Sequence, residues 1–164
     1  MNHNSAPQVH TIEPFIRPDS RVLILGSFPS VQTRASGFFY GHPQNRFWRM
    51  MAEIFNEPAP LDTHEKMLLL EAHHLAVWDV IGSCRITGSS DASIRNATVN
   101  PIKVLVQGTG IRMVLVNGSL AGKLYQQHAD KMPTLPFRIL PSTSPANAAW
   151  SLDRLVSVWK EAMM

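Results

Sequence analysis

Hydrophobic residues along the chain alternate between short continuous runs and spaced helical stripes. The continuous runs are typical of parallel strands covered on both faces, and they predict strands over residues 22–26, 75–81, 112–117 and 136–140. Apolar spacing and capping residues predict helices between and after the strands. These helices are expected over residues 43–55, 63–73, 102–107, 119–129 and 148–163. Residues 1–20 contain three prolines and are expected to form a loosely attached lead-in.

Strands alternate with helices along the whole chain, which predicts a single α/β domain over residues 1–164. The expected fold is a three-layer α/β/α sandwich around a mainly parallel four-stranded sheet. Right-handed crossovers place every strand-to-helix connection at the same sheet edge. The loops at 26–42, 81–96 and 141–147 should therefore meet at one cleft, and long loops inside compact domains are usually functional or mobile.

Composition narrows the class of protein without choosing a function. Hydrophobic content of 45% and charged content of 16% fit a globular domain. The net charge of +3 permits a polyanionic partner. No apolar run approaches the ~20 residues of a membrane span, and the polar start does not suggest secretion. We expect a cytoplasmic monomer, associated with the nucleoid in a bacterium, with no membrane partner.

Cysteine usage limits the possible cofactors. Cys84 is the only cysteine in the chain, so an internal disulfide and a cysteine-built zinc or iron–sulfur site are excluded. The histidines show no metal-ligand spacing, and the loops contain neither a dinucleotide fingerprint nor a phosphate-binding P-loop. No cofactor and no metal are expected.

The residues of the three loops suit a flat, polar, aromatic ligand. Tyr40 can stack on a ring, and backbone N–H groups of the 26–30 turn can donate to ring carbonyls. Asn45 can hold a water or read an amide edge, because its side chain both donates and accepts. Asp79 can accept from a ring N–H, and the 142–144 tract can contact phosphate oxygens. A nucleobase attached to its backbone meets all of these demands.

Three segments resemble a known family. Residues 37–48, Gly-Phe-Phe-Tyr-Gly-His-Pro-Gln-Asn-Arg-Phe-Trp, closely resemble the same region of mismatch-specific uracil/thymine-DNA glycosylases. Residues 25–30 and 140–147 are similar to the first and second motifs of the uracil-DNA glycosylase superfamily. Phe28 stands where most members place a water-positioning Asn or Asp, and Leu140 stands where many have His or Asn. Both departures resemble the hypoxanthine-DNA (deoxyinosine) glycosylase branch.

The resemblance implies hydrolysis of the N-glycosidic bond of a deaminated base that is flipped out of DNA. Hypoxanthine is the first expected base, and uracil or xanthine are further ones. In this branch the essential carboxamide is the Asn of a His-Pro-x-Asn segment, here Asn45, which would orient the attacking water. No lysine lies in the three loops, so no Schiff base and no strand cleavage are expected. The residues expected to bind the base are Ser27, Phe28, Tyr40 and Asp79.

DNA contacts are expected from two arginines and from the last loop. Arg34 and Arg46 are candidates for phosphate contacts. The loop residues expected to touch DNA are Ser142, Thr143, Ser144 and Asn147. The expected partner is double-stranded DNA that carries a deaminated base, and single-stranded DNA is an open alternative.

Simpler interpretations of the same residues stay open. Asn45 can bond locally within the first helix, Tyr40 can be a core aromatic, and Phe28 can plug its turn. Asp79 can brace a loop, and His42 can serve packing or chemistry. For the whole protein, the alternatives are a mismatch-specific uracil/thymine-DNA glycosylase or a non-catalytic nucleotide- or lesion-binding α/β protein.

Overall fold

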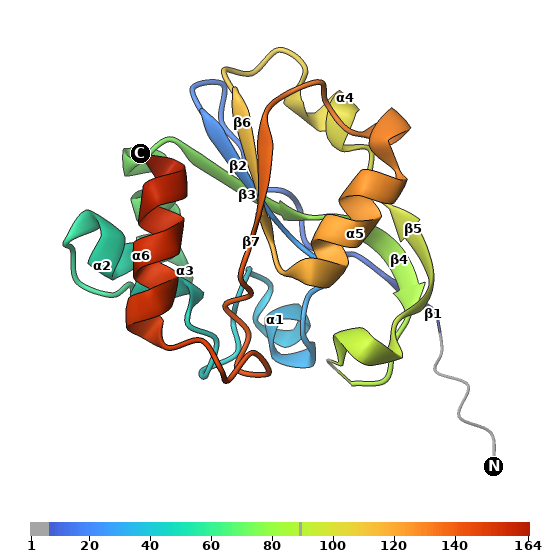
Figure 1. The fold of residues 1–164 in the computed structure, drawn as a ribbon, viewed down its shortest axis with the longest axis horizontal. Helices are drawn as coiled ribbons and strands as arrows, with labels where there is room; N and C mark the ends of the chain where they lie inside the picture. The colour runs from blue at the N-terminus through green and yellow to red at the C-terminus, as the bar shows by residue number, and fades with distance from the viewer. Residues whose placement is uncertain (1–6, 89) are drawn as a thin grey trace.

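Four parallel strands form the central sheet of the computed structural model, which describes residues 7–88 and 90–164 (Figure 1). The strands are β2 (Val22–Gly26), β3 (Leu75–Asp79), β6 (Met113–Asn117) and β7 (Phe137–Leu140). Their spatial order is β3-β2-β6-β7, and all three pairings are parallel. The predicted parallel sheet is thus confirmed, with strand bounds that lie close to the predicted ones.

Strand β2 shows why its sequence is apolar without alternation. Val22 and Ile24 belong to one buried cluster, whereas Leu23 and Leu25 belong to a second cluster on the other face. Successive side chains of a strand point to opposite faces, so both faces must be apolar when both are covered. The helices on the first face are α2 (Phe47–Phe55), α3 (Thr63–Ala72) and α6 (Leu152–Met163), and those on the second are α4 (Ile102–Val106) and α5 (Ser119–Gln127) (Figure 1).

A second, antiparallel sheet occupies a region that the sequence predicts as loop. It consists of β1 (Pro7–Val9), β4 (Ile81–Arg85) and β5 (Arg95–Val99), in the order β1-β4-β5. The prediction of a loop over residues 81–96 is wrong at both ends, because residues 81–85 and 95–96 are strand, and residue 89 lies outside the described chain. The chain leaves the parallel sheet after β3, where Asn100 Nδ2 donates to the carbonyls on both sides of the bend, those of Asp79 and Ile81.

A short helix, α1 (Val31–Ser36), lies inside the predicted 26–42 loop. Ser30 caps it, because its Oγ accepts from the Thr33 backbone N–H at 3.0 Å. Gly37 ends it with a φ of 79°, a conformation that glycine adopts without steric penalty. The loop is therefore partly ordered into a helix whose start faces the sheet edge.

Two longer helices start later than their apolar stripes suggest. Helix α2 begins at Phe47 rather than 43, since the Asn45 side chain accepts from the Phe47 N–H at 3.0 Å in the turn before it. Helix α6 begins at Leu152 rather than 148, because Ser151 caps it by accepting from the Arg154 N–H. Helix α6 thus starts at a side-chain cap, whereas the N-cap residue of α2, Arg46, makes no capping bond with its side chain. Apolar spacing reports neither start.

The segment before β2 is attached to the domain. Phe15 pairs with Val77 as an isolated antiparallel bridge and is 3% exposed. Ile12 is also buried, and its carbonyl accepts from Trp78 Nε1 at 3.1 Å. The expectation of a loose lead-in is thus wrong for residues 7–20, and residues 1–6 lie outside the described chain.

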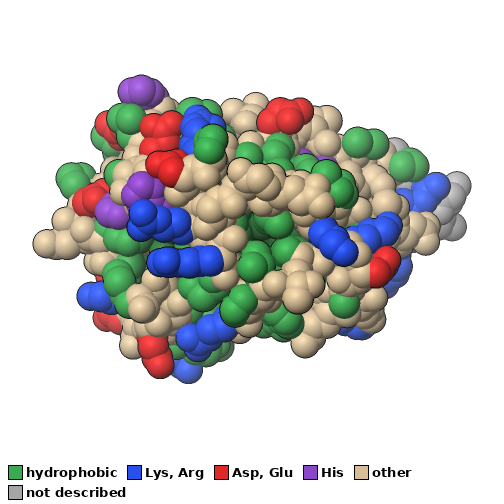
Figure 2. Space-filling view, turned by 90° about the horizontal axis from the view of Figure 1, so that it is seen from above, with side chains coloured by type: hydrophobic (Ala, Val, Ile, Leu, Met, Phe, Trp, Pro, Cys, Tyr) green, Lys and Arg blue, Asp and Glu red, His purple; other side chains and the backbone are tan. Residues whose placement is uncertain are grey.

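Basic side chains do not gather into one patch at the edge where the parallel strands begin. Figure 2 looks onto that edge and shows Lys and Arg side chains at several separate places among apolar and polar surface. This distribution matches the absence of a basic run in the sequence. Within the described ranges, none of the helices combines the length and the apolar character that a membrane span requires.

Candidate active site

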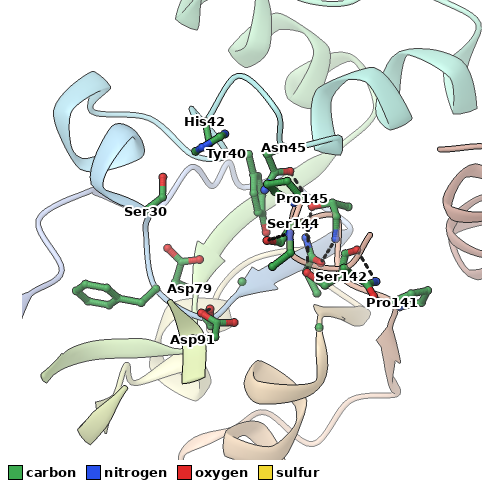
Figure 3. A pocket seen from close by; sticks show the side chains of 18 of the residues that line it. Ser30, Tyr40, His42, Asn45, Asp79, Asp91, Pro141, Ser142, Ser144 and Pro145 are labelled. Atoms are coloured by element: carbon green, nitrogen blue, oxygen red, sulfur yellow. Dashed lines mark hydrogen bonds between the residues drawn. The ribbon is translucent and has the colours of Figure 1, made fainter. Parts of the chain in front are cut away.

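A cavity of about 740 Å³ opens at the carboxyl edge of the parallel sheet (Figure 3). The ends of all four parallel strands contribute to its wall, through Gly26, Asp79, Asn117 and Leu140. The turn after β2, the 141–147 loop and Asp91 from the connection between β4 and β5 complete it. The three segments predicted as loops therefore contribute to one cavity, although residues 81–96 are largely strand and 3-10 helix and reach it through Asp91. Open α/β folds bind ligands at this edge.

Asn45 is held at the cavity wall by a buried network. Its Oδ1 accepts from the Phe47 N–H at 3.0 Å and from the Thr143 hydroxyl at 2.9 Å. Thr143 Oγ1 accepts in turn from Asn117 Nδ2 at 3.0 Å, and Asn117 Oδ1 accepts from the Thr143 N–H at 3.1 Å. The bond to Phe47 is the local one that the simpler interpretation proposed. The bond to Thr143 ties Asn45 to a segment 98 residues away.

This network also settles which end of the carboxamide faces the cavity. A backbone N–H can only donate, so the atom of Asn45 that meets the Phe47 N–H must be the oxygen. No described residue bonds the Asn45 Nδ2. The amide nitrogen is thus the group that Asn45 offers to a ligand.

Tyr40 lies between the cavity and the core. Its ring stacks on Phe47 with centroids 4.1 Å apart and an interplanar angle of 23°. Its buried hydroxyl makes no hydrogen bond of normal geometry to a described residue. Burial, and secondarily the negative charge of Asp79, raise the pKa of the Tyr40 phenol far above its usual range, and the nearby Asn117 amide opposes this rise only weakly. The phenol therefore stays neutral and keeps a free donor.

Asp79 is a buried carboxylate whose partner comes from the start of the chain. It is 4% exposed, and its Oδ2 lies 2.7 Å from His10 Nε2. His10 Nδ1 accepts from the Ile12 N–H at 3.2 Å, so Nε2 carries the ring proton and donates to Asp79. Asp79 Oδ1 also lies close to Gly26, so that a Cβ atom on Gly26 would collide with this oxygen. Asp79 is therefore both a cavity residue and a braced one.

A second carboxyl group, Asp91, lines the cavity from the short 3-10 helix η1 (Asp91–Ser93). Its Oδ1 accepts from the Ser27 hydroxyl at 3.0 Å. Desolvation raises the pKa of the Asp91 carboxyl, the Ser27 hydrogen bond opposes this rise, and the charge of Asp79 adds to it. Ser27 thus presents its hydroxyl to a carboxylate rather than to the open cavity.

Phe28 and Arg34 pack against each other beside the cavity. Phe28 is 8% exposed and belongs to a small cluster with residues of β4. Its ring meets His10 edge to face at 5.9 Å, and the Arg34 guanidinium lies 5.4 Å above it. Arg34 also donates to the Pro29 carbonyl at 2.9 Å. Phe28 therefore plugs its turn, as one of the two open interpretations held, while still lining the cavity.

Arg46 makes its hydrogen bonds within the protein, to the 141–147 loop and the residues just after it. Its guanidinium donates to four backbone carbonyls, those of Thr143, Ser144, Asn147 and Trp150. An arginine has five N–H donors, so at most one is left for a phosphate. This geometry favours an organising role for Arg46 over the phosphate contact expected from the sequence.

The residues of the 141–147 loop divide into buried and surface positions. Thr143 is completely buried, so the expected DNA contact by its side chain is wrong, and it holds Asn45 instead. Ser142, Ser144 and Asn147 are partly exposed and line the cavity. Their side chains bond within the loop, for example Asn147 Nδ2 to the Ser142 carbonyl at 3.0 Å. Across the cavity from Ser142 and Ser144 lie Asp79 and Asp91 (Figure 3).

His42 also lines the cavity, beside Tyr40 (Figure 3). Its Nδ1 accepts from the Gln44 N–H at 3.0 Å, which leaves the proton on Nε2. The ring is thus held as a donor within its loop, which fits a bonding role in the turn before α2.

The comparisons with known proteins agree with this geometry. A family model described as the uracil DNA glycosylase superfamily matches residues 13–162. The chain belongs to this superfamily. Two curated relatives, both named hypoxanthine DNA glycosylase, are each 31% identical to the chain. The relative from Methanosarcina barkeri aligns over 91% of this chain and 94% of its own length, and that from Methanosarcina acetivorans over 83% and 86%.

A solved structure shares the fold as well. It is a solution NMR structure of a Methanosarcina acetivorans protein assigned provisionally as a uracil DNA glycosylase, with 28% identity and a TM-score of 0.79. The similarity covers 93% of this chain and 94% of that one. Membership of the superfamily confirms the resemblance read from residues 25–30, 37–48 and 140–147. It also confirms the sandwich fold and the enzyme class, a DNA glycosylase.

Three residues of the site were not found from the sequence. Asn117 carried a usable signal, because it ends a predicted strand at the same sheet edge as Asp79. Asp91 lay in a predicted loop with no feature to distinguish it. Nothing in the sequence around His10 indicated its role. It contacts Asp79, 69 residues away, because β1 pairs with β4 in a sheet that was not predicted.

Proposed function

We propose that the protein is a monofunctional glycosylase that removes a deaminated base from DNA, hypoxanthine first and uracil or xanthine as further substrates. The observation that carries this proposal is a carboxamide, Asn45, fixed at the wall of a cavity at the carboxyl sheet edge. The names of the two relatives support hypoxanthine as the first base. The reaction hydrolyses the bond between the base nitrogen and C1′ of the sugar.

The polar groups of the cavity suit a base with a lactam edge. Asp79 is acceptor-only when ionised, so it matches the ring N–H that hypoxanthine, uracil and xanthine all carry. Tyr40 lines the cavity and stacks on Phe47 with one face, and the other face is the proposed stacking surface for the base. Backbone N–H groups of residues 27, 28 and 30 are the proposed donors to the base carbonyl. A cavity of about 740 Å³ lies within the usual size range of ligand sites.

The proposal includes no strand cleavage. Lyase chemistry requires an amine that attacks the sugar, and no lysine occurs among the described residues that line the cavity. The product is then an abasic site in an intact strand.

The proposed DNA contacts are Arg34 and three residues that line the cavity, Ser142, Ser144 and Asn147.

A lesion panel tests the proposal. Duplexes with deoxyinosine, deoxyuridine or deoxyxanthosine, opposite matched and mismatched bases, are incubated with the protein, and free base is measured by chromatography. We expect free hypoxanthine and strand breaks that appear only after hot alkali. Release of uracil or thymine from mismatches alone would favour a mismatch-specific enzyme instead. Intact glycosidic bonds for every lesion, with DNA binding retained, would point to a non-catalytic binder.

The variant Asn45→Ala tests whether the carboxamide is needed for turnover. Loss of one preorganised polar group at a reacting centre lowers turnover by about 100-fold or more, and we expect this loss without loss of the folded state. The fold is checked by circular dichroism, and the rate by single turnover on deoxyinosine. An unchanged rate would place the chemistry on another residue.

A further inference from the structure

The carboxamide oxygen of Asn45 is already fully used within the protein. It accepts from the Phe47 N–H at 3.0 Å and from the Thr143 hydroxyl at 2.9 Å. A carbonyl oxygen has two lone pairs, so these two donors leave no place for a hydrogen of a water. The orientation of water by this oxygen, which the family resemblance implies, thus has no free acceptor in this geometry.

The hydroxyl of Thr143 is oriented toward Asn45 by a second amide. Asn117 Nδ2 donates to Thr143 Oγ1, so the hydroxyl proton has to point elsewhere, and its partner is Asn45 Oδ1. The Thr143 N–H also binds Asn117 Oδ1, which fixes both ends of the Asn117 amide. Thr143 is fully buried and Asn117 is 7% exposed, so water does not compete for these bonds.

We propose that Asn45 acts as a hydrogen-bond donor to the departing base through Nδ2, and that Thr143 is the positioning residue that holds it in this role. The inference rests on the proposed glycosylase function and assigns the step at which the carboxamide works. An amide N–H that donates to a water draws electron density away from the oxygen that has to attack C1′, so it would not activate that water. The same N–H placed on the base strengthens its bond as negative charge develops there.

Departure of the base comes first in this reaction. The bond between C1′ and the base nitrogen breaks, and its electron pair leaves with the base. Asn45 Nδ2–H donates to a carbonyl oxygen or ring nitrogen over which the charge spreads, without transferring its proton. A water then adds to the cationic C1′, and its surplus proton reaches the base anion through solvent. The products are a neutral free base and an abasic sugar.

Asn45→Asp separates the two possible roles of the side chain. Aspartate keeps the shape and the acceptor oxygens of Asn45 but has no donor, so it retains the ability to orient a water. If Asn45 is a donor, we expect the single-turnover rate of Asn45→Asp on deoxyinosine to fall by about 100-fold or more, the same loss that we expect for Asn45→Ala. A rate of the aspartate variant near that of the wild type would overturn the inference. Wild-type protein that releases no base at all would instead remove the proposed function.

Thr143→Val and Thr143→Ser test the positioning role. Valine removes the hydroxyl at similar volume, and we expect a fall in rate of about tenfold, the equivalent of one hydrogen bond of about 1.4 kcal/mol, with unchanged DNA affinity. Serine keeps the hydroxyl and should restore the rate. Urea denaturation records any stability loss from the unpaired Asn117 amide.

A double-mutant cycle distinguishes positioning from general support of the fold. If Thr143 acts through Asn45, Thr143→Val should have no further effect in the Asn45→Ala background. The same tenfold loss in both backgrounds would show that Thr143 only stabilises the loop, and it would overturn the assignment of Thr143 as a positioning residue.

Discussion

Replacement of Arg46 by alanine should release the loop that completes the active site. The Arg46 guanidinium reaches four carbonyls of residues 143–150 from the turn before α2. Two of these bonds are well placed, to the Ser144 carbonyl at 2.9 Å and to the Asn147 carbonyl at 3.1 Å. The loop carries Thr143, so its release should also loosen the hold on Asn45.

The stability effect follows from the number and kind of these bonds. A hydrogen bond to a charged group contributes about 1.5 kcal/mol or more, so four together would contribute about 6 kcal/mol if none were replaced. The carbonyls lie in a partly exposed loop and can rebind water once the guanidinium is gone, which reduces the expected loss to about 3 kcal/mol. For a chain of this size, that loss lowers the melting temperature by about 6 to 12 °C.

Urea and thermal denaturation of Arg46→Ala measure this loss, and single-turnover base release measures its effect on activity. Arg46→Lys is the matched control, because lysine keeps the charge but cannot span several carbonyls with a planar fork. We expect the lysine variant to recover little of the stability. An alanine variant within about 1 kcal/mol of the wild type, the scale of a surface ion pair, would refute the assignment of Arg46 as the organiser of this loop.

Three further predictions concern the carboxyl groups of the cavity. Gly26→Ala places a Cβ against Asp79 Oδ1, and we expect weaker substrate binding in a folded protein, measured as a raised KM. His10→Ala leaves the buried Asp79 carboxylate without its donor, which should destabilise the protein by about 2 kcal/mol and lower activity. His10→Gln can still donate and should recover part of both losses in the same urea and turnover measurements. Asp91→Asn removes a group whose folded-state pKa is raised above its ordinary 3.8. Because the pKa is raised, ionisation of Asp91 costs stability: the cost is absent below pH 3.8 and fully present above the folded-state pKa. The neutral variant avoids this cost, so it should be the more stable protein at pH 7, and in pH-dependent urea denaturation the difference should vanish below pH 3.8.

Much of the parallel sheet could be predicted because its signal is strong and local. Strand β2 matches its predicted bounds, since five consecutive buried residues between two covered faces must be almost entirely apolar. The same reasoning places Gly26 and Asp79 at the same edge, and hence Asn45 and the 141–147 loop nearby. Residues 25–30, 37–48 and 140–147 then identify the superfamily, which the family model confirms.

The antiparallel sheet could not be predicted in the same way. Strands β4 and β5 contain partly exposed and polar residues, such as Ser83 and Asn96, and show no clear alternation. Their pairing with β1 is a tertiary effect that local pattern does not encode. Because His10 directly follows β1, the partner of Asp79 was missed together with this sheet.

The roles of Arg46 and Thr143 show a second limit. A sequence reports that an arginine and a threonine occur in loops near the site, which is equally typical of DNA contacts and of internal bonds. Only the three-dimensional arrangement reveals that Thr143 is completely buried and that Arg46 donates to four carbonyls. Contacts across about one hundred residues depend on how the final loop folds back onto the turn before α2.

The bond between His10 and Asp79 connects the active site to the segment that begins with β1, although this segment precedes the whole sandwich along the chain. A shortened protein that begins after residue 10 would keep all four parallel strands and lose the imidazole that aims the carboxylate. Trimming this enzyme to its α/β/α unit, or fusing a bulky partner directly onto β1, would therefore impair substrate handling while leaving the sandwich intact.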